Sequence, residues 1–284
     1  MNTTFLQIAQ RELKRAFAEI KLSVRVVPAL VEPDSGVDER GRYWAYPFDD
    51  VGLWLDPDGR AAEVWMVADS SDEHFFLPVA TFTLGVCLNL QGQIAIHANA
   101  VDLAGQAVAF VGDSGRGKST LTAYCLLQGA GLITDDVFTA DAQALAQPGY
   151  PRLKLLPQTG QQLGLQALAL SGLKIHYQPQ HLQAKFQEQP VPLRTIYLLE
   201  ESTDGRIYSE TVPPSQAVFA LLTHSYHALL GNMLYQSFSY RLAEDPSLLD
   251  AYVGLVTQVP VKRLYYPRDF KRLPGVYTFL VNDR

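Results

Sequence analysis

The sequence lacks the features of a secreted or membrane-spanning protein. Only two cysteines, Cys87 and Cys125, occur among 284 residues, and both lie in apolar runs. We expect each to be buried as a small apolar side chain, because their number and spacing fit no zinc site and favour no disulfide. The N-terminal residues lack the basic-then-apolar order of a signal peptide, and no apolar run approaches the ~20 residues that span a bilayer. We therefore expect a cytoplasmic protein without a membrane span.

An excess of positive charge is also absent. The formal net charge is −6, so no general basic field attracts the phosphates of nucleic acid. Hydrophobic residues make up 48% of the chain and charged residues 18%, as in globular domains. The length allows one large core or two smaller ones. We expect no nucleic-acid partner, and any polyanion would need a local site.

The N-terminal part of the chain predicts an α+β region. Residues 4–20 carry apolar side chains at three- or four-residue steps, which is typical of an amphipathic helix. Short strands separated by turns are expected over residues 43–68, with the Asp-Pro-Asp-Gly sequence at 56–59 as a hairpin signal. Residues 75–90 are apolar enough for a buried helix. We assign residues 1–90 to an N-terminal region that is a candidate for substrate recognition.

The remainder, residues 91–284, is assigned to a catalytic α/β domain. Two alternating segments, 93–103 and 106–112, predict an antiparallel hairpin. A helix over 118–128 and a short strand over 131–137 should follow it. Further predictions are an extended segment at 149–157, a helix at 163–170, a buried strand at 191–200 and the longest helix of the chain within 215–242.

The hairpin leads into a phosphate-binding loop. Residues 112–119 read Gly-Asp-Ser-Gly-Arg-Gly-Lys-Ser and match the pattern G-x-x-x-x-G-K-[ST]. The glycines let successive backbone N–H groups point inward at a helix N-terminus, where they bind phosphate. The lysine would contact the β- and γ-phosphates, and the serine hydroxyl would bind Mg²⁺. The predicted ATP-binding residues are Gly112, Asp113, Ser114, Gly115, Arg116, Gly117, Lys118, Ser119 and Thr120.

Two adjacent aspartates and one histidine are candidates for metal binding and proton transfer. Asp135 and Asp136 end the strand that follows the loop helix. Because neighbouring strand residues point to opposite faces, one carboxylate could hold metal or accept a proton while the other orients a second group. A turn with solvated carboxylates is the alternative. His97 lies on the strand before the hairpin turn, either near the γ-phosphate or as a hydrogen-bonded core histidine.

These elements together resemble the C-terminal catalytic domain of bacterial HPr kinase/phosphorylase. The resemblance covers residues 93–137: His97 stands 15 residues before Gly112, and the two aspartates follow Lys118 by 17 and 18 residues. It implies an α/β fold with a P-loop kinase core of the type shared by HPr kinase and phosphoenolpyruvate carboxykinase. By this resemblance Asp135 is the catalytic acid/base, assisted by His97 and Lys118. Asp136 and Ser119 are then near the Mg²⁺ site.

The resemblance extends to a narrower group. Thr120 stands where the family has a glutamate, and no ERGLG-like stretch follows the aspartates, which argues against HPr as the substrate. The chain is similar to HPr-kinase-like proteins of lasso-peptide maturation in its length, in its core at 96–137 and in the YPRLKL sequence at 150–155. That group phosphorylates a C-terminal serine of a precursor peptide. The resemblance thus implies a serine hydroxyl of a peptide or protein as acceptor, and the hexamers of the family imply a homo-oligomer.

Several cations are candidates for binding the acceptor, although each could be an ordinary surface cation. Arg152 and Lys154 rank first, because alternation in YPRLKL sends both to one face. Lys185 and Arg194 are the other two. Three alternatives to a peptide kinase stay open: a small-molecule kinase, a nucleotide-switched ATPase or GTPase, and a nucleotide-binding partner without turnover.

Overall fold

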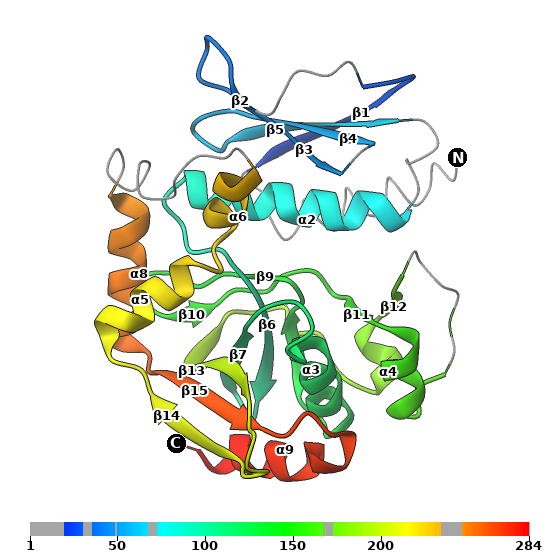
Figure 1. Cartoon of the computed structure of the whole chain (residues 1–284), viewed down its shortest axis with the longest axis vertical. Helices are drawn as coiled ribbons and strands as arrows, with labels where there is room; N and C mark the ends of the chain where they lie inside the picture. Colours follow the sequence, from blue (N-terminus) through cyan, green and yellow to red (C-terminus); the bar gives the residue numbers. More distant parts are fainter. Residues whose placement is uncertain are drawn as a thin grey trace. The chain divides into compact units, whose positions relative to one another are not determined.

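The chain forms two compact units in a computed structural model (Figure 1). The model describes residues 20–30, 36–48, 50–67, 73–166, 168, 173–233 and 246–283. The first unit consists of Met1–Ala95 and Ser225–Ala251, and the second of Ile96–His224 and Tyr252–Arg284. Residues 1–90, expected to form the N-terminal region, belong to the first unit, and so does Ser225–Ala251 of the expected catalytic domain. The helix expected over residues 4–20 lies outside the described residues, apart from its last position.

The first unit is a five-stranded sheet with helix α2 against one face (Figure 1). Its strand order is β1-β5-β4-β3-β2, with β1 parallel to β5 and the other pairs antiparallel. In β5, Ala62, Val64 and Met66 are buried while the residues between them are partly exposed, the alternation typical of a half-buried strand. The predicted strands, the hairpin at 56–59 and the buried helix are confirmed. The elements are β1 (Lys21–Val27), β2 (Gly36–Val37), β3 (Tyr43–Phe48), β4 (Val51–Leu55), β5 (Ala61–Val67), α2 (Glu73–Leu90) and α6 (Tyr226–Met233).

The second unit is built on an eight-stranded mixed sheet, with six strands in the order β14-β15-β13-β7-β6-β8, β10 paired with β13 and β9 paired with β6. Two further strands, β11 and β12, form a separate pair. The central strand of the larger sheet, β7, is buried at five consecutive positions, as expected for a strand covered on both faces. β7 pairs antiparallel with β6 and parallel with β13, which confirms the predicted hairpin. The strands are β6 (Ile96–Leu103), β7 (Gln106–Val111), β8 (Gly131–Thr134), β9 (Val137–Phe138), β10 (Leu145–Ala146), β11 (Leu153–Leu155), β12 (Ile175–Tyr177), β13 (Val191–Glu201), β14 (Tyr208–Thr211) and β15 (Val261–Tyr266).

Helix α3 covers one face of this sheet and follows directly on the glycine-rich loop. Phe110, Leu199 and Leu264 of the sheet are buried in one core with Leu121 of α3 and Val276 of α9. The helix ends before Gly129, whose φ of 94° fits the expected glycine cap. The helices of this part of the chain are α3 (Lys118–Leu127), α4 (Pro157–Gln162), α5 (Pro214–Leu222), α8 (Ser247–Gln258) and α9 (Leu273–Asn282), with short 3₁₀ turns at Pro179–Leu182 and Phe270–Arg272.

Two helix predictions are wrong. The helix expected over 163–170 is absent at residues 163–166, because α4 ends at Gln162 and Gly164 turns the chain with a φ of 71°. The helix expected over 215–242 is broken into α5 and α6, and residues 234–242 lie outside the described part. The break follows from hydrogen bonding: the carbonyl of His224 accepts from the backbone N–H of His97, and the Ser225 hydroxyl accepts from the N–H of Ala228.

Both cysteines are free and buried, as expected. Burial raises the pKa of each thiol to about 12, so neither is a thiolate at neutral pH. Among the helices of the described residues, none has the length and apolar character that crossing a membrane requires.

A glycine allows the close approach of α2 to α6 in the first unit. A Cβ added to Gly85 would lie 2.4 Å from two ring carbons of Tyr226. Gly254, in the interior of α8, has no such neighbour within 4 Å. The two positions therefore form a matched pair of helical glycines.

We expect Gly85→Ala to lower the free energy of unfolding by about 1–2 kcal/mol, since the overpacking outweighs the gain in helix propensity. Gly254→Ala should raise it by up to about 1 kcal/mol, because only the propensity changes. Urea denaturation of both variants tests this. Equal effects would show that Tyr226 does not constrain α2.

Candidate active site

The phosphate loop joins the carboxyl end of β7 to the first residue of α3. Gly115 and Gly117 have φ values of 82° and 94°, in the left-handed region that glycine adopts most readily. A Cβ on Gly117 would lie 2.6 Å from the hydroxyl oxygen of Tyr266. That hydroxyl donates to the carbonyl of Arg116 at 3.0 Å, so the end of β15 holds the loop in place.

Lys118 is buried at the base of this loop, with 7% of its surface exposed. Its Nζ donates to the carbonyls of Gly112 at 2.5 Å and of Asp113 at 3.3 Å. An ammonium has three donors, so one is left for a phosphate oxygen. Burial lowers the pKa of Lys118, and the negative charge of Asp135 partly offsets this effect. Ser119 and Thr120 follow on the first turn of α3 and are partly exposed.

Asp135 is a buried carboxylate with one unused oxygen. Only 4% of the residue is exposed, and its Oδ2 accepts from the backbone N–H of Lys154 at 3.0 Å. Its Oδ1 is buried and makes no hydrogen bond of ordinary geometry, and the same holds for Nδ2 of the buried Asn99. The amide of Asn99 is nevertheless close enough to lower the pKa of Asp135. Burial raises the pKa of Asp135, against the lowering effect of Lys154. The carboxylate is therefore a stronger proton acceptor than an exposed one.

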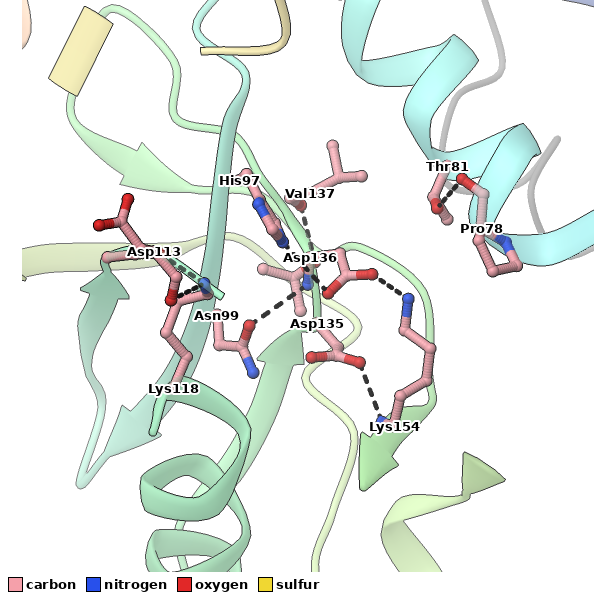
Figure 2. A network of polar contacts seen from close by, with 12 residues as sticks. Pro78, Thr81, His97, Asn99, Asp113, Lys118, Asp135, Asp136, Val137 and Lys154 are labelled. Atoms are coloured by element: carbon pink, nitrogen blue, oxygen red, sulfur yellow. Dashed lines mark hydrogen bonds and ion pairs between the residues drawn. The ribbon is translucent and has the colours of Figure 1, made fainter. Parts of the chain in front are cut away.

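Asp136 has a different environment from its neighbour (Figure 2). Its φ of 70° is unusual for a residue other than glycine. One carboxylate oxygen is ion-paired with Nζ of Lys154, and the other lies 3.7 Å from Nε2 of His97. Its backbone N–H lies 3.4 Å from the side-chain oxygen of Asn99. Asp136 is thus a partner of basic side chains, while Asp135 is held by a backbone N–H and lies beside the amide of Asn99.

Lys154 connects the two aspartates. It lies on β11, and its side chain is 13% exposed. Because its backbone N–H binds Asp135 and its ammonium binds Asp136, one residue holds both carboxylates. Burial lowers the pKa of Lys154, and Asp135 offsets part of this.

The other predicted acceptor cations lie in different surroundings. The guanidinium of Arg152 stacks over the ring of Tyr150, at 5.9 Å from its centroid. Lys185 is exposed, and its carbonyl accepts from the N–H of Leu132. Arg194 donates to the carbonyl of Leu280 at 2.6 Å and so joins β13 to α9. Of these four cations, the structure brings Lys154 into contact with the aspartates.

Two polar residues of the site were missed in the sequence. Asn99 follows His97 by two positions on β6, so the period of a strand could have placed both on one face. Lys174 precedes β12 and is exposed, yet its charge lowers the pKa values of His97, Lys118 and Lys154. No motif marks Lys174, because the β11–β12 pairing brings it toward the site from a distant part of the chain.

His97 is neutral at neutral pH. Burial, followed by the charges of Lys118, Lys154 and Lys174, lowers its pKa to about 3. A neutral imidazole can orient Asp136 or exchange a proton, but it adds no positive charge.

The donor set fits Mg²⁺. Ser119 offers a hydroxyl and the aspartates offer carboxylate oxygens, the hard ligands that Mg²⁺ prefers. Within the described residues no group of three or more His, Cys, Asp and Glu side chains gathers. Magnesium in nucleotide sites needs no such group, because one or two carboxylates and the phosphates suffice. The unpartnered Oδ1 of Asp135 is an oxygen that a cation or a hydroxyl could use, whereas Asp136 is ion-paired with Lys154.

The second unit has a P-loop α/β fold. The sequence itself matches no family model and no curated protein. Among solved structures, it is similar to the HPr(Ser) kinase/phosphatase from Coxiella burnetii, with a TM-score of 0.34 and 13% sequence identity. This match covers 68% of the present chain and 97% of that chain.

We expect Lys154→Met to lower the free energy of unfolding by about 3 kcal/mol, because it leaves the largely buried Asp136 without its cation. The double variant Lys154→Met/Asp136→Asn should recover at least half of that loss. Lys185→Met is the control, with an expected change within about 0.5 kcal/mol. Urea denaturation checks all three, and equal losses in the Lys154 and Lys185 variants would contradict a stabilising role of the pair.

The stability of the protein should fall in acid partly through His97. Its folded pKa lies below the usual value of 6.5, so between pH 6.5 and about 3 the unfolded state binds an additional proton. The free energy of unfolding therefore decreases as the pH falls through this range. His97→Gln should make this decrease shallower. Part of the pH dependence should remain, because burial also lowers the pKa values of His224 and His227. Denaturation series from pH 8 to pH 5 test this; identical slopes would refute it.

Proposed function

We propose that this protein is an ATP-dependent kinase that transfers the γ-phosphoryl group to a serine hydroxyl of a peptide or protein. One observation carries the proposal: the buried carboxylate of Asp135 and the buried loop lysine Lys118 lie in one cluster of polar side chains (Figure 2), and the charge of Asp135 raises the pKa of Lys118 against the effect of burial. A phosphate cradle alone binds nucleotide. A cradle beside a proton acceptor also suits transfer to a hydroxyl.

The loop and its helix would bind the phosphates of ATP. Backbone N–H groups of the glycine-rich loop and Nζ of Lys118 are the donors for the phosphate oxygens. Ser119 and Asp136, through the carboxylate oxygen that faces His97 instead of Lys154, would hold Mg²⁺, which would neutralise charge on the phosphates. These groups stabilise the negative charge of the transferring phosphoryl group, and this is the main contribution that a protein makes to such a reaction.

Asp135 would act as the base. As the bond between the acceptor oxygen and the γ-phosphorus forms, the bond from that phosphorus to the β,γ-bridging oxygen breaks and ADP leaves. The hydroxyl proton passes to the carboxylate of Asp135. Its raised pKa suits this role, because a more basic carboxylate accepts the proton more readily. Lys154 holds Oδ2 through its backbone N–H, which leaves Oδ1 for the acceptor.

The acceptor we favour is the C-terminal serine of a lasso-type precursor peptide. Such a residue presents a hydroxyl and an α-carboxylate close together. Lys174 is exposed, and its charge lowers the pKa of the proposed base, so a cation is available near Asp135 for a carboxylate. The similarity of residues 96–137 and 150–155 to kinases of lasso-peptide maturation points to the same acceptor.

The test is mass spectrometry after incubation with Mg-ATP. We expect one phosphate to be added to a peptide with a C-terminal serine, and no addition to the same peptide ending in alanine. Asp135→Asn should reduce transfer by a factor of about 10² to 10⁴ while ATP binding stays nearly unchanged. Lys118→Ala should weaken ATP binding and transfer together.

Asp204→Asn, in an exposed turn, is the control and should keep full activity. Full transfer by Asp135→Asn would contradict the base assignment. ADP release without a phosphorylated peptide would favour a small-molecule kinase or an ATPase. ATP binding without any product would favour a nucleotide-binding partner without turnover.

A further inference from the structure

The carboxyl ends of three parallel strands meet beside the phosphate loop. β7, β13 and β15 run parallel in adjacent positions of the sheet. β7 ends at the loop, β13 at Glu200 and Glu201, and β15 at Tyr265 and Tyr266. In open α/β sheets, ligands bind at this edge. It is therefore the region in which the rest of a loop-bound nucleotide should lie.

The strand order indicates toward which strands a loop-bound nucleotide would extend. His97 and Asp135 come from β6 and from the end of β8, on one side of β7, whereas β13, β15 and β14 lie on the other side. If the γ-phosphate lies next to Asp135, as the proposed function requires, the triphosphate crosses the loop and its nucleoside extends toward β13 and β15.

Side chains on that side form a continuous row. Nη1 of Arg116, in the loop, lies 3.8 Å from a carboxylate oxygen of Glu200, whose other oxygen lies 3.3 Å from Nη1 of Arg263. Tyr265 is the register partner of both Glu200 and Tyr208. The rings of Tyr208 and Tyr265 are stacked, with centroids 4.7 Å apart and planes inclined by 14°. Since strands are about 4.8 Å apart, Tyr265 stands roughly 10 Å from the strand that carries the loop.

This row is accessible. Leu199, Leu264 and Tyr266 are buried in the core with α3, so the residues that alternate with them project from the opposite face. The side chains of Arg116, Glu200 and Arg263 are 37%, 32% and 38% exposed. Half-exposed ion pairs of this kind contribute little to stability, so their charged groups can exchange one another for a ligand at little cost.

We infer that Glu200, Arg263 and Tyr265 form the nucleoside subsite of the loop-bound nucleotide; the inference rests on the proposed function. The planar guanidinium and the phenol rings suit a base, because aromatic rings and arginine stack on the π-face of any base. The carboxylate of Glu200 accepts hydrogen bonds from ribose hydroxyls or from an exocyclic amine. The ligand class is a nucleoside di- or triphosphate.

The test compares two ligands that share phosphates but differ in the nucleoside. Isothermal titration measures the affinity of the full chain for ATP and for inorganic tripolyphosphate. Tyr265→Ala and Glu200→Gln should each weaken ATP binding at least tenfold and leave tripolyphosphate binding within twofold. Arg263→Met serves as a second surface variant if the Tyr265 variant fails to fold. Tyr277→Ala, which removes a ring from the separate Tyr124–Tyr277 pair, is the control and should change neither affinity.

Unchanged ATP affinity in the Glu200 and Arg263 variants would overturn the subsite. Equal weakening of both ligands would also overturn it, since the residues would then act on the loop instead of the nucleoside. The variant Lys118→Ala distinguishes a failure of the nucleoside subsite from a failure of the phosphate loop. It should weaken the binding of both ATP and tripolyphosphate. If it weakens neither, the phosphate loop, and with it the proposed function, is wrong. If it weakens both while the three subsite variants bind ATP normally, the subsite alone fails.

Discussion

The pairing of β7 on both sides is the constraint on which the second unit depends. Antiparallel pairing with β6 and parallel pairing with β13 bury this strand and place its carboxyl end in the middle of the sheet edge. The phosphate loop continues from that end into α3, so its position follows from the sheet. β6 and β8 then supply catalytic candidates on one side of the loop, and β13 and β15 supply the proposed nucleoside subsite on the other.

Charge balance explains why these candidates can be buried together. Lys118, Lys154 and Asp135 are each shielded from water, and an isolated charge in such a place would be costly. Lys154 offsets both aspartates, and Lys118 is held by backbone carbonyls of its own loop. One oxygen of Asp135 makes no hydrogen bond of ordinary geometry, and burial of its charge costs free energy and raises its pKa, as is typical of reactive sites.

Local patterns predicted much of the fold. Alternation in residues 93–103 and 106–112 was sufficient for the hairpin, and Gly129 marked the end of α3. The prediction failed where a tertiary contact competed with local preference. The apolar residues of 215–242 favour one long helix, yet the hydrogen bond from the N–H of His97 to the carbonyl of His224 interrupts it, and the chain enters the other unit at Ser225.

The sequence by itself determined the glycine-rich loop that matches the phosphate-binding pattern and the spacing of His97, Asp135 and Asp136, because these depend on residue types at short range. Only the tertiary structure decided how the aspartates differ. Both are carboxylates at adjacent positions, but β11 places Lys154 so that its ammonium pairs with Asp136 and its backbone contacts Asp135. Likewise the row from Arg116 to Tyr208 draws on residues between positions 116 and 265, and only the pairing of β15 with β13 and with β14 brings them together.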